Sequence, residues 1–384
     1  MNFEYSEEQT MLKDSVARFV REQYDFDTRR AIVASEAGMS QEFWAMFAEL
    51  GWLSVPFAEE YGGYGGTSED VAAMMEELGK GNVVEPFVAT VLLFGGLLAR
   101  SDNKDLKSAV IPKIIDGTCL GAFGFLERQS RFELTDVKTS ATASDVGWVL
   151  NGDKAVVVNA ANADQLIVTA RTSGGQFDRQ GISLFLLDSN AEGVEISPFV
   201  MMDGQKVANI SLRDVFVPAS QQVGVLDAGM DLVDLVIPQV LLALCSEALG
   251  IMVKLNEATL NYTKTRKQFG VPISSFQILQ HRMVDTFMAA EQARSMVYRG
   301  LCAFGDGGSI DSTERYRSLH AMKVVVAKSS KLIGEEAIQM HGGMGMTDEL
   351  DIGHFVKRLM TLNVMFGDGD FHQKKFNQLS YQSA

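Results

Sequence analysis

The stretch WVLNGDKAVVV, residues 148–158, holds two β-prone runs separated by a turn signal. The first run is Trp148–Leu150, and the second is Ala155–Val158, which is mostly valine. Aromatic and β-branched side chains favour strands. The intervening Asn151-Gly152-Asp153 contains the Asn-Gly pair typical of a tight hairpin turn. The stretch therefore predicts two antiparallel strands that turn at Gly152.

Similar short β-prone runs extend on both sides of this stretch, from Thr118 to about Val217. They include Leu166–Val168 and Ile182–Leu187. Parallel strands need crossover connections of about a dozen residues, and the runs lie too close together to contain them. We therefore expect a middle domain, residues 118–225, built as an antiparallel β-barrel or sheet.

The residues before this domain, 1–117, predict helices. Ser6 begins a capping-box pattern, and Ser40 can cap a helix that ends at Gly51. A further helix is expected from about Glu69, with Gly79 as its stop. The residues after the domain, 226–384, predict four long helices at about 229–265, 275–304, 312–340 and 348–378. The fold class is therefore α+β, with a C-terminal four-helix bundle.

Composition excludes several classes of function. A net charge of −15 makes nucleic acid an improbable partner. The three cysteines, Cys119, Cys245 and Cys302, show no CxxC pattern, so neither zinc nor another metal is expected, and the thiols fit a reducing cytoplasm. The most apolar run, residues 235–245, is too short to span a membrane, and no signal peptide is apparent. We expect a cytoplasmic protein without a membrane partner.

Three glycine-rich segments stand out. The first, residues 62–66, is predicted to be a flexible turn between helices. Residues 266–270, RKQFG, and 339–345, QMHGGMG, each close a predicted helix. A guanidinium can bind a pyrophosphate through two hydrogen bonds, and glycines let backbone N–H groups approach phosphate oxygens closely. Two such segments at the ends of one bundle indicate a nucleotide-type ligand.

Together with PFAEEYGGYGG at residues 56–66, these motifs resemble the acyl-CoA dehydrogenase family along the whole chain. The resemblance implies FAD as cofactor, an acyl-CoA substrate and an electron-transfer flavoprotein or similar acceptor. It also implies a set of residues that reach across a subunit interface to a neighbour's FAD: Arg266, Gln268, Phe269, Gln339, Gly342 and Gly343. The run MFGDGDFH, residues 365–372, is similar to small subunits of pimeloyl-CoA-type and steroid side-chain enzymes, which are bacterial heteromers. A homologous partner in a heterotetramer is therefore expected.

Several family residues are absent from their usual positions. The family's base precedes a glycine, and the aligned residue here is Gly367. An alternative base position of the family, on the helix that precedes the RKQFG segment, corresponds to Val240. The family's thioester-binding arginine corresponds to Leu241. The flavin-facing polar or aromatic positions correspond to Leu126, Val156 and Val158.

Asp368, Glu247 and Asp370 are the acids that could replace the base, with Asp368 nearest the usual position. Three hypotheses follow. The chain is a subunit that completes a partner's FAD site, or a self-sufficient dehydrogenase that uses Asp368 or Glu247, or a non-catalytic structural partner.

Overall fold

The computed structural model describes residues 5–304 and 311–381, and the chain forms two compact units. The helical unit comprises Met1–Arg30, Thr67–Val83 and Leu241–Ala384. The sheet unit comprises Ala31–Gly66 and Val84–Val240. The N-terminal third of the chain is divided between the two units, so each is discontinuous in sequence.

The helices of the helical unit follow the predicted segments closely. They are α1 (Glu7–Gln23), α4 (Ser68–Gly81), most of α7 (Gly229–Thr265), α8 (Gln277–Phe304), α9 (Ser312–His341), α10 (Asp351–Val364) and α11 (Gly369–Tyr381). The expected capping box is present, since Gln9 N–H donates to Ser6 Oγ over 3.1 Å and the Gln9 side chain accepts from Ser6 N–H. The α+β class and the helical C-terminal region are thereby confirmed.

The last predicted helix, 348–378, is wrong as a single element. It is interrupted between α10 and α11, where Phe366 and Gly367 have φ values of 56° and 112°. A right-handed helix cannot continue through two residues with positive φ. The helical periodicity on both sides concealed this break.

Gly79 does not end α4, which continues to Gly81 before Asn82 takes a left-handed conformation at φ 51°. A Cβ atom on Gly79 would lie 2.2 Å from the Glu247 carbonyl oxygen of α7. Reciprocally, a Cβ on Gly250 of α7 would lie 1.9 Å from the Glu76 carbonyl oxygen of α4. The two glycines therefore allow α4 and α7 to cross backbone against backbone.

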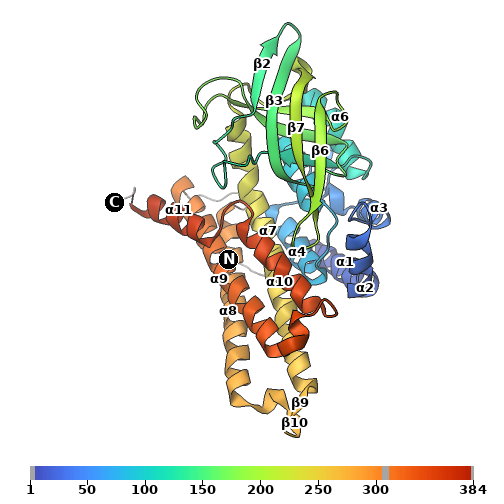
Figure 1. Cartoon of the computed structure of the whole chain (residues 1–384), viewed down its shortest axis with the longest axis vertical. Coiled ribbons are helices and arrows are strands. Elements are labelled where there is room, and N and C mark those ends of the chain that lie inside the picture. The colour runs from blue at the N-terminus through green and yellow to red at the C-terminus, as the bar shows by residue number, and fades with distance from the viewer. Residues whose placement is uncertain (1–4, 305–310, 382–384) are drawn as a thin grey trace. The chain divides into compact units, whose positions relative to one another are not determined.

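The long helices of the bundle are also joined by buried polar contacts, and Figure 1 shows α8 and α9 running side by side. Asn256 of α7 donates to the Thr286 carbonyl of α8 over 3.1 Å, and Ser329 of α9 to the Ala289 carbonyl of α8 over 2.9 Å. By length and composition α7 could cross a membrane, with an 18-residue window of mean hydropathy 1.9, but 83% of that window is buried. It is packed as the core helix of this protein.

The sheet unit contains the β-strands of the middle domain. They are β1 (Gly121–Gly124), β2 (Ser140–Ser144), β3 (Gly147–Val158), β4 (Gln165–Arg171), β5 (Ile182–Asp188), β6 (Val194–Val200), β7 (Lys206–Pro218) and β8 (Gln222–Val223). Their order is β6-β7-β3-β2-β4-β5-β8, with β1 beside β4, and Figure 1 shows β2, β3, β7 and β6 in sequence. The pairing is mostly antiparallel, as predicted, but β1 and β4 are parallel.

The predicted hairpin turn at Gly152 is wrong, because Asn151-Gly152-Asp153 lies inside β3. The chain instead turns at residues 145–146, between Ser144 and Gly147. Gly152 occupies an irregularity in the β3–β7 register, and a Cβ there would lie 2.5 Å from Thr139 Oγ1. The glycine serves a close approach within the sheet, which the same dipeptide signals as readily as a turn.

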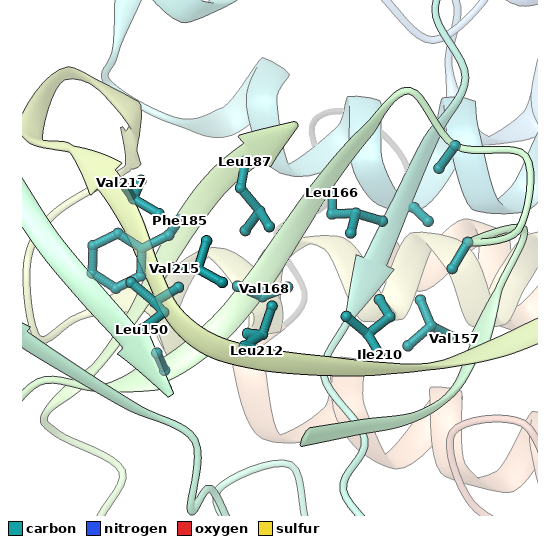
Figure 2. Packing of buried hydrophobic residues seen from close by; sticks show 14 of the residues in the cluster. Leu150, Val157, Leu166, Val168, Phe185, Leu187, Ile210, Leu212, Val215 and Val217 are labelled. Atoms are coloured by element: carbon teal, nitrogen blue, oxygen red, sulfur yellow. The ribbon is translucent and has the colours of Figure 1, made fainter. Parts of the chain in front are cut away.

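Apolar side chains from most of the strands form the core of the sheet unit. Figure 2 shows Leu150, Val168, Phe185 and Leu212 gathered between β3, β4, β5 and β7. All four are completely buried. Strands β4 and β5 are buried along almost their whole length, so the core does not depend on a strict alternation of apolar and polar residues.

The glycine-rich segment 62–66 is an ordered loop and not a flexible one. Gly65 N–H donates to the Phe57 carbonyl and Gly66 N–H to the Val55 carbonyl, each over 2.8 Å. A Cβ on Gly63 would lie 2.0 Å from the Phe57 carbonyl oxygen. These glycines therefore fold the segment back onto its own preceding residues.

Gly250→Ala should destabilise the protein even though alanine favours helix, because the added methyl would meet the Glu76 carbonyl. We expect a loss of about 2–3 kcal/mol in the free energy of unfolding, measured by chemical denaturation with circular dichroism. Gly334→Ala in α9 is the matched control. Its Cβ would lie 3.4 Å from the nearest atom, on Val356, so this change should be neutral or stabilising by up to about 1 kcal/mol. Equal destabilisation by both would contradict the close crossing.

Candidate functional site

The RKQFG segment begins where α7 ends and forms an exposed β-hairpin. Its strands are β9 (Lys267–Gln268) and β10 (Val271–Pro272), and Phe269 and Gly270 turn at φ 54° and 82°. Two successive positive φ values are the pattern of a tight hairpin turn. The prediction that the segment closes a helix is therefore incomplete, since it also projects a hairpin with Phe269 92% exposed at its tip.

Arg266, at the base of this hairpin, is free to bind an anion. Its side chain is exposed, and no ion pair joins it to another residue within 5–304 and 311–381. The backbone around it is fixed, because Arg266 N–H donates to the Tyr262 carbonyl over 2.8 Å and Ile273 N–H donates to the Arg266 carbonyl over 2.9 Å. A fixed base with an uncommitted guanidinium suits an external anionic ligand. Gln268 and Phe269 are exposed beside it.

The QMHGGMG segment ends α9 and opens its backbone to solvent. Gly342 has φ 60°, and a Cβ on Gly342 or Gly343 would meet no atom within 4 Å. Packing inside the chain therefore gives no reason for glycine at position 343. Gln339 is exposed next to them, whereas Gly345 is buried against the Ile338 carbonyl. Open glycines of this kind let a phosphate-bearing group approach the backbone closely.

A stacked pair of rings joins the two segments. Tyr262, in the last turn of α7, stacks on His341, in the last turn of α9, with ring centroids 4.4 Å apart and planes at 29°. His341 Nδ1 lies 2.8 Å from the Ala337 carbonyl, which can only accept, so this nitrogen carries the proton. Tyr262 was missed in the sequence. It lies four residues before Arg266 and resembles any half-buried helix residue there.

The positions expected to face the flavin ring lie in the sheet unit and carry no polar side chain. Val156 is 40% exposed at φ 52°, an uncommon conformation for a β-branched residue, and its N–H donates to Asn209 Oδ1 over 3.2 Å. Leu126 and Val158 are partly exposed. None of the three side chains can hydrogen-bond to a flavin ring. The exposed segments of the helical unit thus fit the phosphates of FAD, and these positions do not fit its ring.

In this part of the sheet unit, buried polar side chains bind one another in the interior. Lys154 donates to Glu127 Oε1 over 2.7 Å and to Thr169 Oγ1 over 2.9 Å. Burial alone would raise the pKa of Glu127, but Lys154 and backbone donors, including Thr139 N–H, lower it to about 2. Burial also lowers the pKa of Lys154 to about 8, against the opposing effect of Glu127. The pair holds the loop after β1 against β3, and both residues lie in the lining of a pocket that also includes Arg128, Glu195 and Ser211.

Asp368 and Asp370 lie on either side of the start of α11. Asp368 Oδ1 accepts from Phe371 N–H over 2.8 Å, which makes Asp368 the cap of the helix. Asp370 is exposed in the first turn. Gly367, at the family's base position, is buried and has no side chain to ionise.

Glu247 is buried on α7 and committed to a partner on α10. Arg358 donates to its two carboxylate oxygens from Nε over 2.6 Å and from Nη2 over 3.0 Å. Glu247 is 3% exposed and Arg358 4%. Val240 and Leu241, at the alternative base and arginine positions, are 0% and 2% exposed and apolar. The described structure therefore offers no uncommitted carboxylate at any position where the resemblance places the base.

Comparisons with known proteins agree with this geometry. Three family models match consecutive parts of the chain: acyl-CoA dehydrogenase N-terminal domain at 6–118, middle domain at 122–215 and C-terminal domain at 228–375. "Probable acyl-CoA dehydrogenase YngJ" of Bacillus subtilis (strain 168) is 30% identical, over 97% of this chain and 98% of that protein. The "L-prolyl-[peptidyl-carrier protein] dehydrogenase" of Serratia sp. (strain ATCC 39006) is 27% identical, over 97% of each. A solved structure of PigA with FAD and proline has a TM-score of 0.91 and 26% identity, over 100% of both chains.

Glu247→Gln should lower the stability of the protein, because it leaves the buried Arg358 guanidinium without its counter-charge. We expect a loss of about 3–5 kcal/mol in the free energy of unfolding, measured by chemical denaturation. Glu257→Gln, an exposed carboxylate on the same helix, is the control and should have little effect. An unchanged stability for Glu247→Gln together with a loss of turnover would indicate a catalytic base instead of a structural ion pair.

Proposed function

Because this chain belongs to the acyl-CoA dehydrogenase family of FAD-dependent oxidoreductases, we propose that it is the FAD-completing subunit of a heteromeric enzyme. The enzyme desaturates an acyl-CoA thioester between Cα and Cβ. When bound, FAD supplies the acceptor for the hydride that leaves Cβ. This chain supplies phosphate-binding groups to the FAD of a homologous partner, and the partner supplies the base.

One contrast carries the proposal. The groups suited to a neighbour's cofactor are exposed and uncommitted, namely the Arg266 guanidinium and the open backbone at Gly342 and Gly343. The acids considered for catalysis are absent, committed or displaced: position 367 is glycine, Glu247 is bound by Arg358, Asp368 caps α11, and Asp370 lies exposed in the first turn of that helix. A chain that binds a partner's cofactor without removing a proton itself accounts for both observations.

In the assembled enzyme, Arg266 would hold the FAD pyrophosphate. Its planar guanidinium can donate two parallel hydrogen bonds to phosphate oxygens. The backbone N–H groups at Gly342 and Gly343 would hold the same part of the cofactor, and the Tyr262–His341 stack joins the two segments. Gln268, Phe269 and Gln339, which are exposed, would line this site.

Removal of the α-proton needs a base that faces the substrate across from the flavin. Asp368 accepts a hydrogen bond from Phe371 N–H at the start of α11, so it is poorly placed to leave that position. The self-sufficient alternative would need Asp368 or Glu247 to give up a structural partner. The purely structural alternative leaves an uncommitted Arg266 without a purpose. An electron-transfer flavoprotein or a similar carrier would accept the electrons.

The chain purified alone should bind FAD weakly, well below one FAD per chain, because Leu126, Val156 and Val158 offer the flavin ring no polar contact. Flavin absorbance against protein concentration, after incubation with excess FAD and gel filtration, measures this. Copurification with its native partner should raise the flavin content. One FAD per chain in the isolated protein, with steady acyl-CoA turnover, would sink the heteromer proposal.

Arg266→Ala should weaken FAD binding by the assembled complex by about ten- to a hundredfold, because a charge-assisted contact to phosphate is lost. Arg266→Lys should recover only part of this affinity, since a point charge cannot replace the planar guanidinium. Fluorescence titration with FAD gives the affinity, and circular dichroism tests the fold, which should be unchanged.

Lys264→Ala is the matched control for Arg266→Ala, because it removes another exposed cation two residues away and should leave the FAD affinity unchanged. If Arg266→Ala kept full affinity at limiting FAD, the segment would be only the end of a helix.

A further inference from the structure

The turn between α10 and α11, residues 365–368, occupies the position where the resemblance places the family's base. Phe366 and Gly367 are both in positive-φ conformations, and Gly367 is buried. A bulky residue such as Phe366 adopts positive φ only where its surroundings hold it there. The contacts of this turn show what holds it.

A side chain at position 367 would clash with the side chains of Phe371 and His372 as they are packed. A Cβ there would lie 2.4 Å from Cδ1 of Phe371 and 2.9 Å from Nε2 of His372, at a φ of 112°. Two other glycines provide a comparison for these distances. Gly270 also has positive φ, but a Cβ on it would meet nothing within 4 Å, and a Cβ on Gly369 would lie an ordinary 3.4 Å from Ala327.

A pair of histidines fixes the carbonyl of Phe366. His372 Nε2 lies 3.1 Å from this carbonyl, which can only accept, so Nε2 carries the proton and Nδ1 is an acceptor. His320 Nδ1 lies 2.8 Å from His372 Nδ1 and is therefore the donor. Burial lowers the pKa of His320 to about 4 and that of His372 to about 3. His320 and Lys323 lower the pKa of His372 further, and Lys375 adds to the effect on both rings. Both rings are neutral near pH 7, so this donor order persists.

Two further contacts hold the ends of the turn. Lys323 of α9 is completely enclosed and donates to the Leu362 carbonyl over 2.6 Å, near the C-terminus of α10. Asp368 accepts from Phe371 N–H at the start of α11. Near the histidines lie Lys323, Lys375 and Tyr316, whose ring centroid is 6.5 Å from that of His320. Asp368 and Cys245 of α7 lie near Lys323. Helix α9 holds the turn through both His320 and Lys323.

We propose that the α10–α11 turn is a closed site, in which Phe371 and the His320–His372 pair exclude every side chain from position 367. A substitution at that residue alone therefore cannot return a base to the chain. The consequence that the partner's base serves the assembled enzyme rests on the proposed function, but the closure of the turn does not.

The test introduces Gly367→Glu, which restores the family's residue type, and Gly367→Ala. Both should lower the midpoint of thermal unfolding by about 5 °C or more, because a buried clash is added to an unfavourable φ. Gly367→Glu should show no turnover of straight-chain acyl-CoA thioesters with excess FAD. Gly369→Ala is the control for an ordinary contact and should leave the midpoint unchanged. Gly270→Ala isolates the effect of positive φ and should give a smaller shift.

If Gly367→Glu fails to fold, the double variant Gly367→Ala/Phe371→Ala decides the question. The alanine at 367 should lower the midpoint clearly less in the Phe371→Ala background than in the wild type, because the clashing ring is gone. An equal loss in both backgrounds, or a wild-type midpoint for Gly367→Glu, would overturn the closed site. An isolated wild-type chain with full FAD and turnover would overturn the proposed function and leave the closed site standing.

Discussion

The helical unit depends on the close crossing of α4 and α7, where Gly79 and Gly250 each face a carbonyl of the other helix. Helix backbones this close leave no room for side chains between them. Glu76 and Glu247, each one turn from the glycine of its own helix, therefore lie in the interior. A buried carboxylate is costly unless it is paired. Each therefore binds an arginine, from α8 and from α10 respectively, and the crossing thereby helps to position both helices.

The same crossing constrains function. It fixes α7, whose far end carries Arg266 and, through the Tyr262–His341 stack, the end of α9. It also commits Glu247 to Arg358, which removes an acid on the family's alternative base helix from proton transfer. The ion pair that joins α7 to α10 is thus one reason why Glu247 is not available as a base.

In the sheet unit, too, the buried polar groups are used to hold the fold. Glu127 and Lys154 meet inside it and bind the loop after β1, while the outward positions that would face a flavin ring are Val156 and Val158. The turn at Gly367 is similar, because the polar side chains buried around it bind backbone carbonyls. In each unit these buried polar side chains hold the fold, whereas Arg266, at the end of α7, and Gln339, near the end of α9, are exposed.

Local sequence patterns were enough to predict the Ser6 capping box, the extent of α7 and the helix–sheet–helix order. Gly79, Gly152 and Gly367 are positions at which local sequence did not reveal the role of the glycine. Glycine permits a turn, a helix end or a close approach, and nothing local distinguishes these uses. The tertiary structure decided each one through residues elsewhere in the chain, such as the Glu247 carbonyl opposite Gly79. The pairing of Glu247 with Arg358 was hidden for the same reason, since the two are 111 positions apart and only packing brings them together.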